Sequence, residues 1–204
     1  MNGAPVTETL QINMWFDYTC PHSHSGLALT KDLSQQLGCV INYLPYLLRP
    51  FAPIPDFGPS NPSNITQIPM GQPLKSGTET LVEPFSNRTL STVLVHEATA
   101  FATTHMKFFE FYEALSREYW DHGADIGSLY LIRKATLQAG LSWESMWGIL
   151  SRSSFRNWVL EQHEQAIIQG VKTIPAYLIG SNLWQGTFTR FDLESAIKQA
   201  LSHP

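Results

Sequence analysis

Cys20 is the residue whose type and surroundings point most directly to chemistry. It follows an apolar run that ends at Phe16, and it precedes Pro21, a residue favoured in the first turn of a helix. A helix N-terminus offers unpaired backbone N–H groups and a partial positive charge, and both favour a thiolate. Three residues further on the chain carries Ser23 and not a second cysteine. Without a C-x-x-C pair, Cys20 has to react as a single thiol.

The second of the two cysteines, Cys39, has a different setting. It follows Gly38 and opens the strand-like run 40–44, so we interpret it as a buried, unreactive thiol. Two cysteines make no disulfide framework. The helix expected between Cys20 and Cys39 also separates them by more than bridging distance.

The composition of the 204 residues is that of a folded protein, with 43% hydrophobic and 12% aromatic residues. A net charge of −4 gives no reason to expect nucleic acid or an anionic membrane as a partner. The N-terminal residues show neither the basic stretch nor the apolar run of a signal peptide, and no apolar run approaches the length of a membrane span. These observations predict a cytoplasmic protein.

The spacing of apolar residues predicts strand, helix and strand in the first quarter of the chain. The strands are expected over 9–16 and 40–48, and the helix over 20–37 with Gly38 as its stop. Because a helix connects the two strands, we expect them to pair in parallel through a right-handed crossover.

Residues 49–84 are rich in proline, with glycine, serine and asparagine between the prolines. Such a composition predicts an irregular loop, either a lid or binding loop or a plain surface excursion. A helical block is expected after it. Apolar residues recur at helical spacing throughout 91–120, which predicts one continuous helix. Asp125 is expected to cap a helix through residue 139, and Ser142 and Ser153 are expected to cap two more.

The last part of the chain returns to strands. A strand is expected over 176–179, directly after Pro175, with a returning hairpin strand over 183–186. An amphipathic helix over 191–201 completes the order βαβ, helical block, ββα.

This order and two motifs resemble the DsbA-like branch of the thioredoxin superfamily. The run Asp17-Tyr18-Thr19-Cys20-Pro21-His22-Ser23 resembles the active-site signature Asp-x-x-Cys-Pro-x-Cys, and Thr173-Ile174-Pro175 resembles the cis-proline segment. The resemblance implies an α/β thioredoxin fold with a helical domain inserted between the second and third strands. Residues 1–50 and 170–204 would form the thioredoxin-like domain, and residues 51–169 the Pro-rich loop and helical insertion.

The resemblance also implies roles for particular residues. Pro175 would be cis and face Cys20, while the Ile174 backbone would pair with an extended thiol substrate such as glutathione. His22 would lie beside the thiolate, and Ser23 would hydrogen-bond the sulfur. The residues expected to complete the substrate or glutathione site are Pro21, Thr173 and Trp184.

The sequence therefore predicts a thiol-dependent enzyme that acts with glutathione. Its reaction is either disulfide exchange or isomerisation of a small enone or polyene, by addition and loss of the thiol. Related kappa-class glutathione transferases and 2-hydroxychromene-2-carboxylate isomerases have serine where Cys20 stands, so their mechanism transfers only loosely.

Two alternatives stay open. One is a non-catalytic thioredoxin-fold binding or chaperone module, and the other is an engineered Cys-to-Ser trap of a dithiol oxidoreductase. The seven histidines form no zinc-ligand pattern and no nucleotide-binding motif occurs, so neither a metal nor a nucleotide cofactor is expected. Homodimer formation is left undecided.

Overall fold

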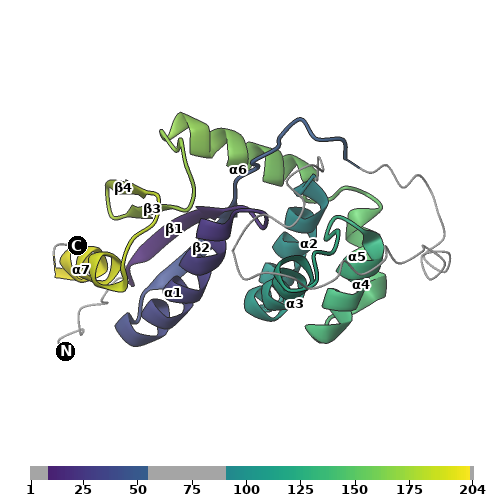
Figure 1. Ribbon diagram of the computed structural model, residues 1–204, viewed down its shortest axis with the longest axis horizontal. Helices are drawn as coiled ribbons and strands as arrows, with labels where there is room; N and C mark the ends of the chain where they lie inside the picture. The colour runs from purple at the N-terminus through teal and green to yellow at the C-terminus, as the bar shows by residue number, and fades with distance from the viewer. Residues whose placement is uncertain (1–8, 55–90, 203–204) are drawn as a thin grey trace, which may run out of the picture. The chain divides into compact units, whose positions relative to one another are not determined.

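The computed structural model describes residues 9–54 and 91–202 (Figure 1). Within these, residues 9–46 and 166–202 form one compact unit, and residues 47–54 and 91–165 form another. We call them the thioredoxin-like unit and the helical unit. The predicted domain boundaries lie after residue 50 and before residue 170. Most of the Pro-rich segment 49–84 lies outside the described residues.

The thioredoxin-like unit is built on a four-stranded sheet of order β2-β1-β3-β4. The parallel pairing predicted for the first two strands, β1 (Gln11–Phe16) and β2 (Val40–Pro45), is confirmed. The hairpin of β3 (Ala176–Ile179) and β4 (Asn182–Gln185) joins β1 in antiparallel orientation. This βαβ and ββα arrangement is the thioredoxin fold that the sequence predicted.

Two helices of this unit, α1 (Pro21–Leu37) and α7 (Arg190–Ser202), contact each other and frame the sheet. The predicted end of α1 is confirmed, since Gly38 has φ 66 and its N–H donates to the Ser34 carbonyl. Glycine adopts this left-handed conformation without the strain that a Cβ would add. At its other end the helix begins directly after Cys20, which is its N-cap residue.

The two faces of the sheet have different neighbours. Tyr43, Met14, Tyr177 and Trp184 are cross-strand partners and therefore share one face. This face is turned toward α1, because the Thr30 hydroxyl donates to the Met14 sulfur. The opposite face carries a core cluster that includes Cys20. The members of that cluster are Trp15, Cys20, Ala166, Val171, Ile174 and Ala176.

The helical unit contains α2 (Val93–Thr104), α3 (Phe108–Trp120), α4 (Leu129–Gln138) and α5 (Trp143–Leu150). The first residues of α6 (Arg156–Ile168) also belong to it. No helix among residues 9–54 and 91–202 is both long enough and apolar enough to cross a membrane.

The single helix predicted over 91–120 is wrong, because the chain turns between α2 and α3. Met106 has φ 58, and the N–H of Lys107 donates back to the Ala102 carbonyl at 2.9 Å. This bond closes α2 in the manner of a helix C-terminus. Neither glycine nor proline marks the turn in the sequence, and apolar residues keep their spacing across it.

The predicted cap at Ser142 is confirmed, since its hydroxyl accepts the Ser145 N–H ahead of α5. Asp125 does not cap α4, which is capped by Ser128, while the Asp125 carboxylate accepts the Gly127 N–H. Ser153 does not cap α6 either. It has φ 50 and lies in a turn before the helix begins at Arg156.

Candidate active site

A compact turn between β1 and α1 positions Cys20. The Asp17 carboxylate accepts hydrogen bonds from both the N–H and the hydroxyl of Thr19, at 2.8 and 2.7 Å. The Asp17 carbonyl accepts the Cys20 N–H at 3.2 Å. Because Asp17 and Thr19 are both buried, these bonds hold the turn in one conformation.

The Cys20 sulfur occupies the place of an N-cap oxygen. It accepts the backbone N–H of Ser23 at 3.4 Å, as a serine or aspartate oxygen would at the start of a helix. No acidic residue lies in the first turn of α1, so the partial positive charge of the helix end is not neutralised there. The arrangement stabilises negative charge on sulfur.

The segment before β3 meets the sulfur from the other side. The Cys20 thiol lies 3.6 Å from the Ile174 carbonyl oxygen, a contact between residues 154 positions apart. The Ile174–Pro175 peptide bond is cis. Cys20 is only 6% exposed and packs in one cluster with Ile174 and Trp15. The structure thus brings together Cys20, Pro21, Ser23, Ile174 and Pro175.

The hydroxyl groups of Ser23 and Tyr177 lie near Cys20, on the side of the sheet that is turned toward α1. Ser23 is fully buried, and its Oγ has no hydrogen-bond partner among the described residues. The predicted bond between Ser23 and sulfur comes from its backbone N–H and not from this hydroxyl. One turn along α1, a Cβ on Gly26 would lie 2.5 Å from the Tyr177 hydroxyl oxygen, so glycine makes room for the tyrosine.

Burial and neighbouring side chains affect the ionisation of the Tyr177 hydroxyl. Burial raises the pKa of the Tyr177 hydroxyl above its ordinary value, and the nearby Tyr43 and Cys20 side chains raise it further. Tyr43 shows the same effect, because burial raises its pKa to about 12 although its hydroxyl donates to Thr30. Both phenols therefore stay protonated at neutral pH.

Gln185, which the sequence analysis did not single out, fixes the segment that leads to Ile174. Its Oε1 accepts the N–H groups of Lys172 and Thr173 at 2.6 and 3.2 Å, and its Nε2 donates to the Gly170 carbonyl at 3.1 Å. Thr173 is thus part of a clamped loop. Residues 12 to 15 positions apart meet here only because the β3–β4 hairpin folds back.

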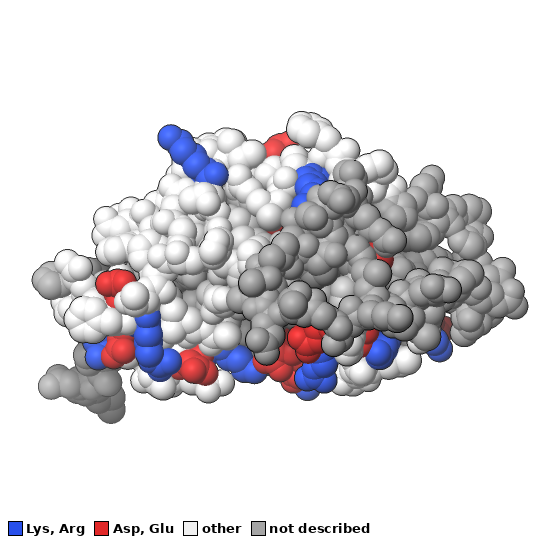
Figure 2. Space-filling model, in the orientation of Figure 1, with Lys and Arg blue, Asp and Glu red and all other residues white. Residues whose placement is uncertain are grey.

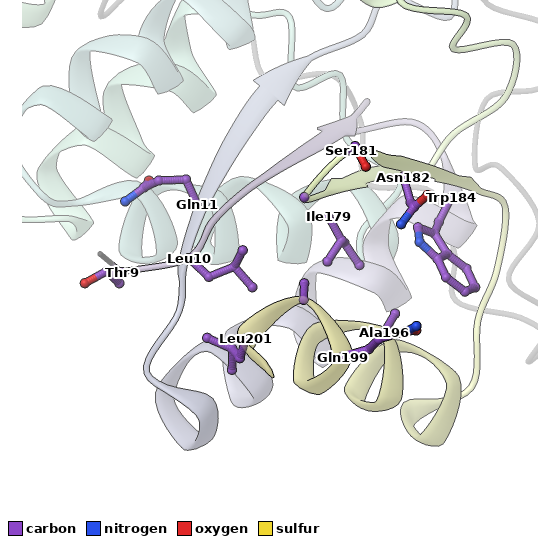
Figure 3. A pocket seen from close by; sticks show the side chains of 12 residues that line it. Thr9, Leu10, Gln11, Ile179, Ser181, Asn182, Trp184, Ala196, Gln199 and Leu201 are labelled. Carbon is purple, nitrogen blue, oxygen red and sulfur yellow. The ribbon is translucent and has the colours of Figure 1, made fainter. Parts of the chain in front are cut away.

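Two predicted site residues, His22 and Trp184, make no hydrogen bond to the Cys20 sulfur. His22 is exposed on the first turn of α1, and its ring makes no hydrogen bond with a described residue. Trp184 lies on the sheet face turned toward α1 and packs edge-on against Phe188. It lines a cavity of about 600 Å³ at the start of β1, together with Thr9 and residues of the hairpin turn and α7 (Figure 3).

Cys39 lies at the other end of the β1–β2 pair from Cys20. It immediately precedes β2, whose first residue Val40 is opposite Gln11, while Cys20 follows the end of β1. A six-residue strand spans roughly 17–20 Å, so the two free, buried cysteines cannot form a disulfide in this fold. In the part of the chain that the structure describes, no group of three His, Cys, Asp or Glu residues could hold a metal ion.

A protein-family model described as a DSBA-like thioredoxin domain matches residues 11–198. The chain is 24% identical over 196 residues to the uncharacterized protein YwbO of Bacillus subtilis (strain 168), covering 93% of this chain and 96% of that protein. A probable DsbA oxidoreductase from Streptomyces coelicolor has a similar structure, with a TM-score of 0.73 at 15% identity over 96% of this chain and 91% of that chain. For a 2-hydroxychromene-2-carboxylate isomerase the TM-score is 0.65 at 18% identity, over 93% and 95% of the two chains.

Proposed function

Because the chain belongs to the DSBA-like thioredoxin domain family, we propose that it is a thiol enzyme that works with glutathione through Cys20 alone. The observation that carries this proposal is the position of the sulfur. It accepts an N–H at the start of α1 and touches the Ile174 carbonyl, while the second cysteine lies at the far end of the sheet. A thiol from solution therefore has to complete any disulfide reaction.

The proposed reaction is disulfide exchange. The Cys20 thiolate attacks one sulfur of a disulfide, a new S–S bond forms, and the old S–S bond breaks. The leaving thiolate keeps the electron pair of the broken bond and takes a proton from water. Reduced glutathione then attacks the mixed disulfide and restores Cys20. A cytoplasmic setting, where glutathione is abundant, belongs to this proposal.

The backbone of Ile174 would align the substrate. The cis-proline segment runs past the sulfur, and an extended thiol peptide such as glutathione can pair with it in the manner of an added strand. Pro21 directly follows Cys20 and Thr173 directly precedes Ile174, so both would border the bound peptide. His22 is exposed next to it and would meet the bound peptide from the solvent side.

A second candidate reaction is isomerisation of a small conjugated substrate by the same thiol. The structural likeness to a 2-hydroxychromene-2-carboxylate isomerase favours it. The thiolate adds to a conjugated carbon, the former double bond rotates, and loss of the thiolate restores the double bond. This reaction consumes no oxidant or reductant.

The test is intact-mass analysis after incubation with oxidised glutathione between pH 4 and pH 9. We expect one glutathione adduct on the wild type, because the start of α1 favours the thiolate that attacks the disulfide. Cys39→Ser should form the same adduct, and Cys20→Ala should form none. Reduced glutathione should release the adduct.

Ser23→Cys provides a further control on the single-thiol mechanism. It restores C-x-x-C spacing, so the adduct should resolve internally to a disulfide without added thiol. The proposal is overturned if the wild type forms no adduct, or if the adduct is on Cys39. A normal adduct that no thiol can release, together with turnover of an enone or polyene, would select isomerisation over exchange.

A further inference from the structure

We propose that Lys172 makes the site selective for thiols and disulfides that carry carboxylates, and that Gln185 holds Lys172 in place for this role. The inference rests on the proposed function, because it concerns the substrate that reaches Cys20. It names a substrate class, anionic thiol compounds, and two residues outside the Cys-Pro-His-Ser motif.

Gln185 fixes the backbone at Lys172. The bond from the Lys172 N–H to Oε1 is 2.6 Å long, and two further bonds of the same side chain hold Thr173 and Gly170. Gly186 directly follows Gln185, the last residue of β4, and its N–H donates to the Pro175 carbonyl at 2.8 Å. The direction in which the lysine side chain leaves the loop is therefore set by β4.

Lys172 lies two residues before Ile174, whose carbonyl touches the Cys20 sulfur. Two residues span at most about 7 Å, and the lysine side chain is long enough to cover a similar distance. Its ammonium group can thus approach the charged ends of a small molecule whose sulfur is at Cys20. The side chain is exposed, so such a molecule can reach it.

The ammonium of Lys172 has no carboxylate partner among the described residues. Two other cations of the thioredoxin-like unit are paired, Arg190 with Asp32 at 3.5 Å and Lys198 with Glu194. Figure 2 shows charges of both signs over α7 and α1, whereas the surface over the β3–β4 hairpin is uncharged in that view. A carboxylate that arrives near Cys20 therefore meets a cation that no protein carboxylate neutralises.

Charge selectivity follows from Coulomb attraction across a solvated gap. Two unit charges interact only weakly across a gap filled with water, and salt weakens this interaction further. Glutathione carries more carboxylates than amino groups, so the attraction favours it over a cationic disulfide. Reversing the charge at position 172 should change the preference about tenfold at low ionic strength.

The experiment measures the rate at which Cys20 forms mixed disulfides with three probes: oxidised glutathione, cystamine and 2-hydroxyethyl disulfide. These are anionic, cationic and neutral. We compare the rate with oxidised glutathione to the rate with cystamine. This ratio should be about tenfold higher in the wild type than in Lys172→Glu. The neutral probe should react equally with both proteins. Lys198→Glu, which changes the net charge equally on α7, should keep the wild-type ratio.

In Gln185→Ala the ratio of the glutathione rate to the cystamine rate should fall about threefold, because the Gln185 side chain no longer holds the loop. These results distinguish a failure of the inference about Lys172 from a failure of the proposed function. If Lys172→Glu keeps the wild-type ratio while all probes react, the inference fails and the proposed function stands. If the neutral probe does not react with wild-type Cys20, the proposed function fails as well.

Discussion

Two buried polar side chains, Ser23 in the thioredoxin-like unit and Glu97 in the helical unit, are partnered in different ways. In the thioredoxin-like unit the hydroxyl of Ser23 is fully buried beside Cys20 without a partner among the described residues. In the helical unit the buried Glu97 is held by Arg156, whose Nε donates to its Oε1 at 2.9 Å. Buried polar groups without partners cost stability and tend to occur where a protein has a function other than stability.

The difference separates polar groups that serve the structure from a hydroxyl beside the candidate nucleophile. The first kind includes the Glu97–Arg156 pair and the Thr136 hydroxyl, which donates to the Ile132 carbonyl at 2.7 Å. Beside the Cys20 sulfur, by contrast, the Ser23 hydroxyl has no partner among the described residues. Changes to the first kind of group should lower stability alone, whereas changes to the second should separate stability from reactivity.

The largest effect is expected for Arg156→Ala in the helical unit. It leaves the fully buried Glu97 without its cation, so the free energy of unfolding should fall by about 3–5 kcal/mol at neutral pH, measured by urea denaturation. Burial raises the pKa of Glu97, although Arg156 opposes this. The loss should shrink as the pH falls, because protonation removes the unpaired charge.

Arg190→Ala is the matched control in the other unit. Its ion pair with Asp32 is 3.5 Å long and exposed on both sides, so the loss should stay below about 1 kcal/mol. Equal losses for the two arginines would contradict the contrast between a structural buried pair and a surface pair.

A second expected effect is a steric clash at Gly26, in the helix that begins at Cys20. In Gly26→Ala the new Cβ would lie 2.5 Å from the Tyr177 hydroxyl and 3.2 Å from the Met14 Cε. Overpacking of this kind should cost about 2 kcal/mol, beyond what the better helix propensity of alanine returns. Tyr177→Phe removes the oxygen and should recover about 1 kcal/mol of it in a double-mutant cycle. Additive effects would show that the two groups do not meet.

The sequence predicted part of the fold and of the candidate site, and the rest became visible only in the structure. The strands, Gly38 and the cysteine at a helix start follow from local patterns, because periodicity and caps are local properties. The break at Met106 was missed because the apolar spacing continues across it. Gln185 was missed because its bonds join residues that only the folded hairpin brings together.

Trp184 shows a different limit. Its aromatic side chain predicted a substrate contact, and alternation in β4 places it with Tyr177 on the sheet face that is turned toward α1. Composition indicates which residues are able to bind a substrate, whereas the register of the strands decides on which face they lie.

A pH-dependent effect at alkaline pH is expected in the thioredoxin-like unit. The pKa of Tyr43 is raised from 10.0 to about 12 by burial, so the folded state holds this proton more tightly than the unfolded chain. The stabilisation is complete below pH 10 and is lost as the pH rises toward 12, by about 2 kcal/mol. Urea denaturation of the wild type and Tyr43→Phe over this range measures it, and identical slopes would contradict it.

The smallest effect compares a buried hydroxyl without a partner with a buried hydroxyl that is paired. Ser23→Ala removes a hydroxyl that has no partner among the described residues, so the free energy of unfolding should stay equal or rise by up to about 1 kcal/mol. Thr136→Val removes a paired hydroxyl and should lower it by about 1 kcal/mol. The rate at which Cys20 reacts with oxidised glutathione should fall in Ser23→Ala and stay unchanged in Thr136→Val. A stability gain with a loss of reactivity would mean that the unpaired hydroxyl serves the thiol, since a purely structural group does not change the two in opposite directions.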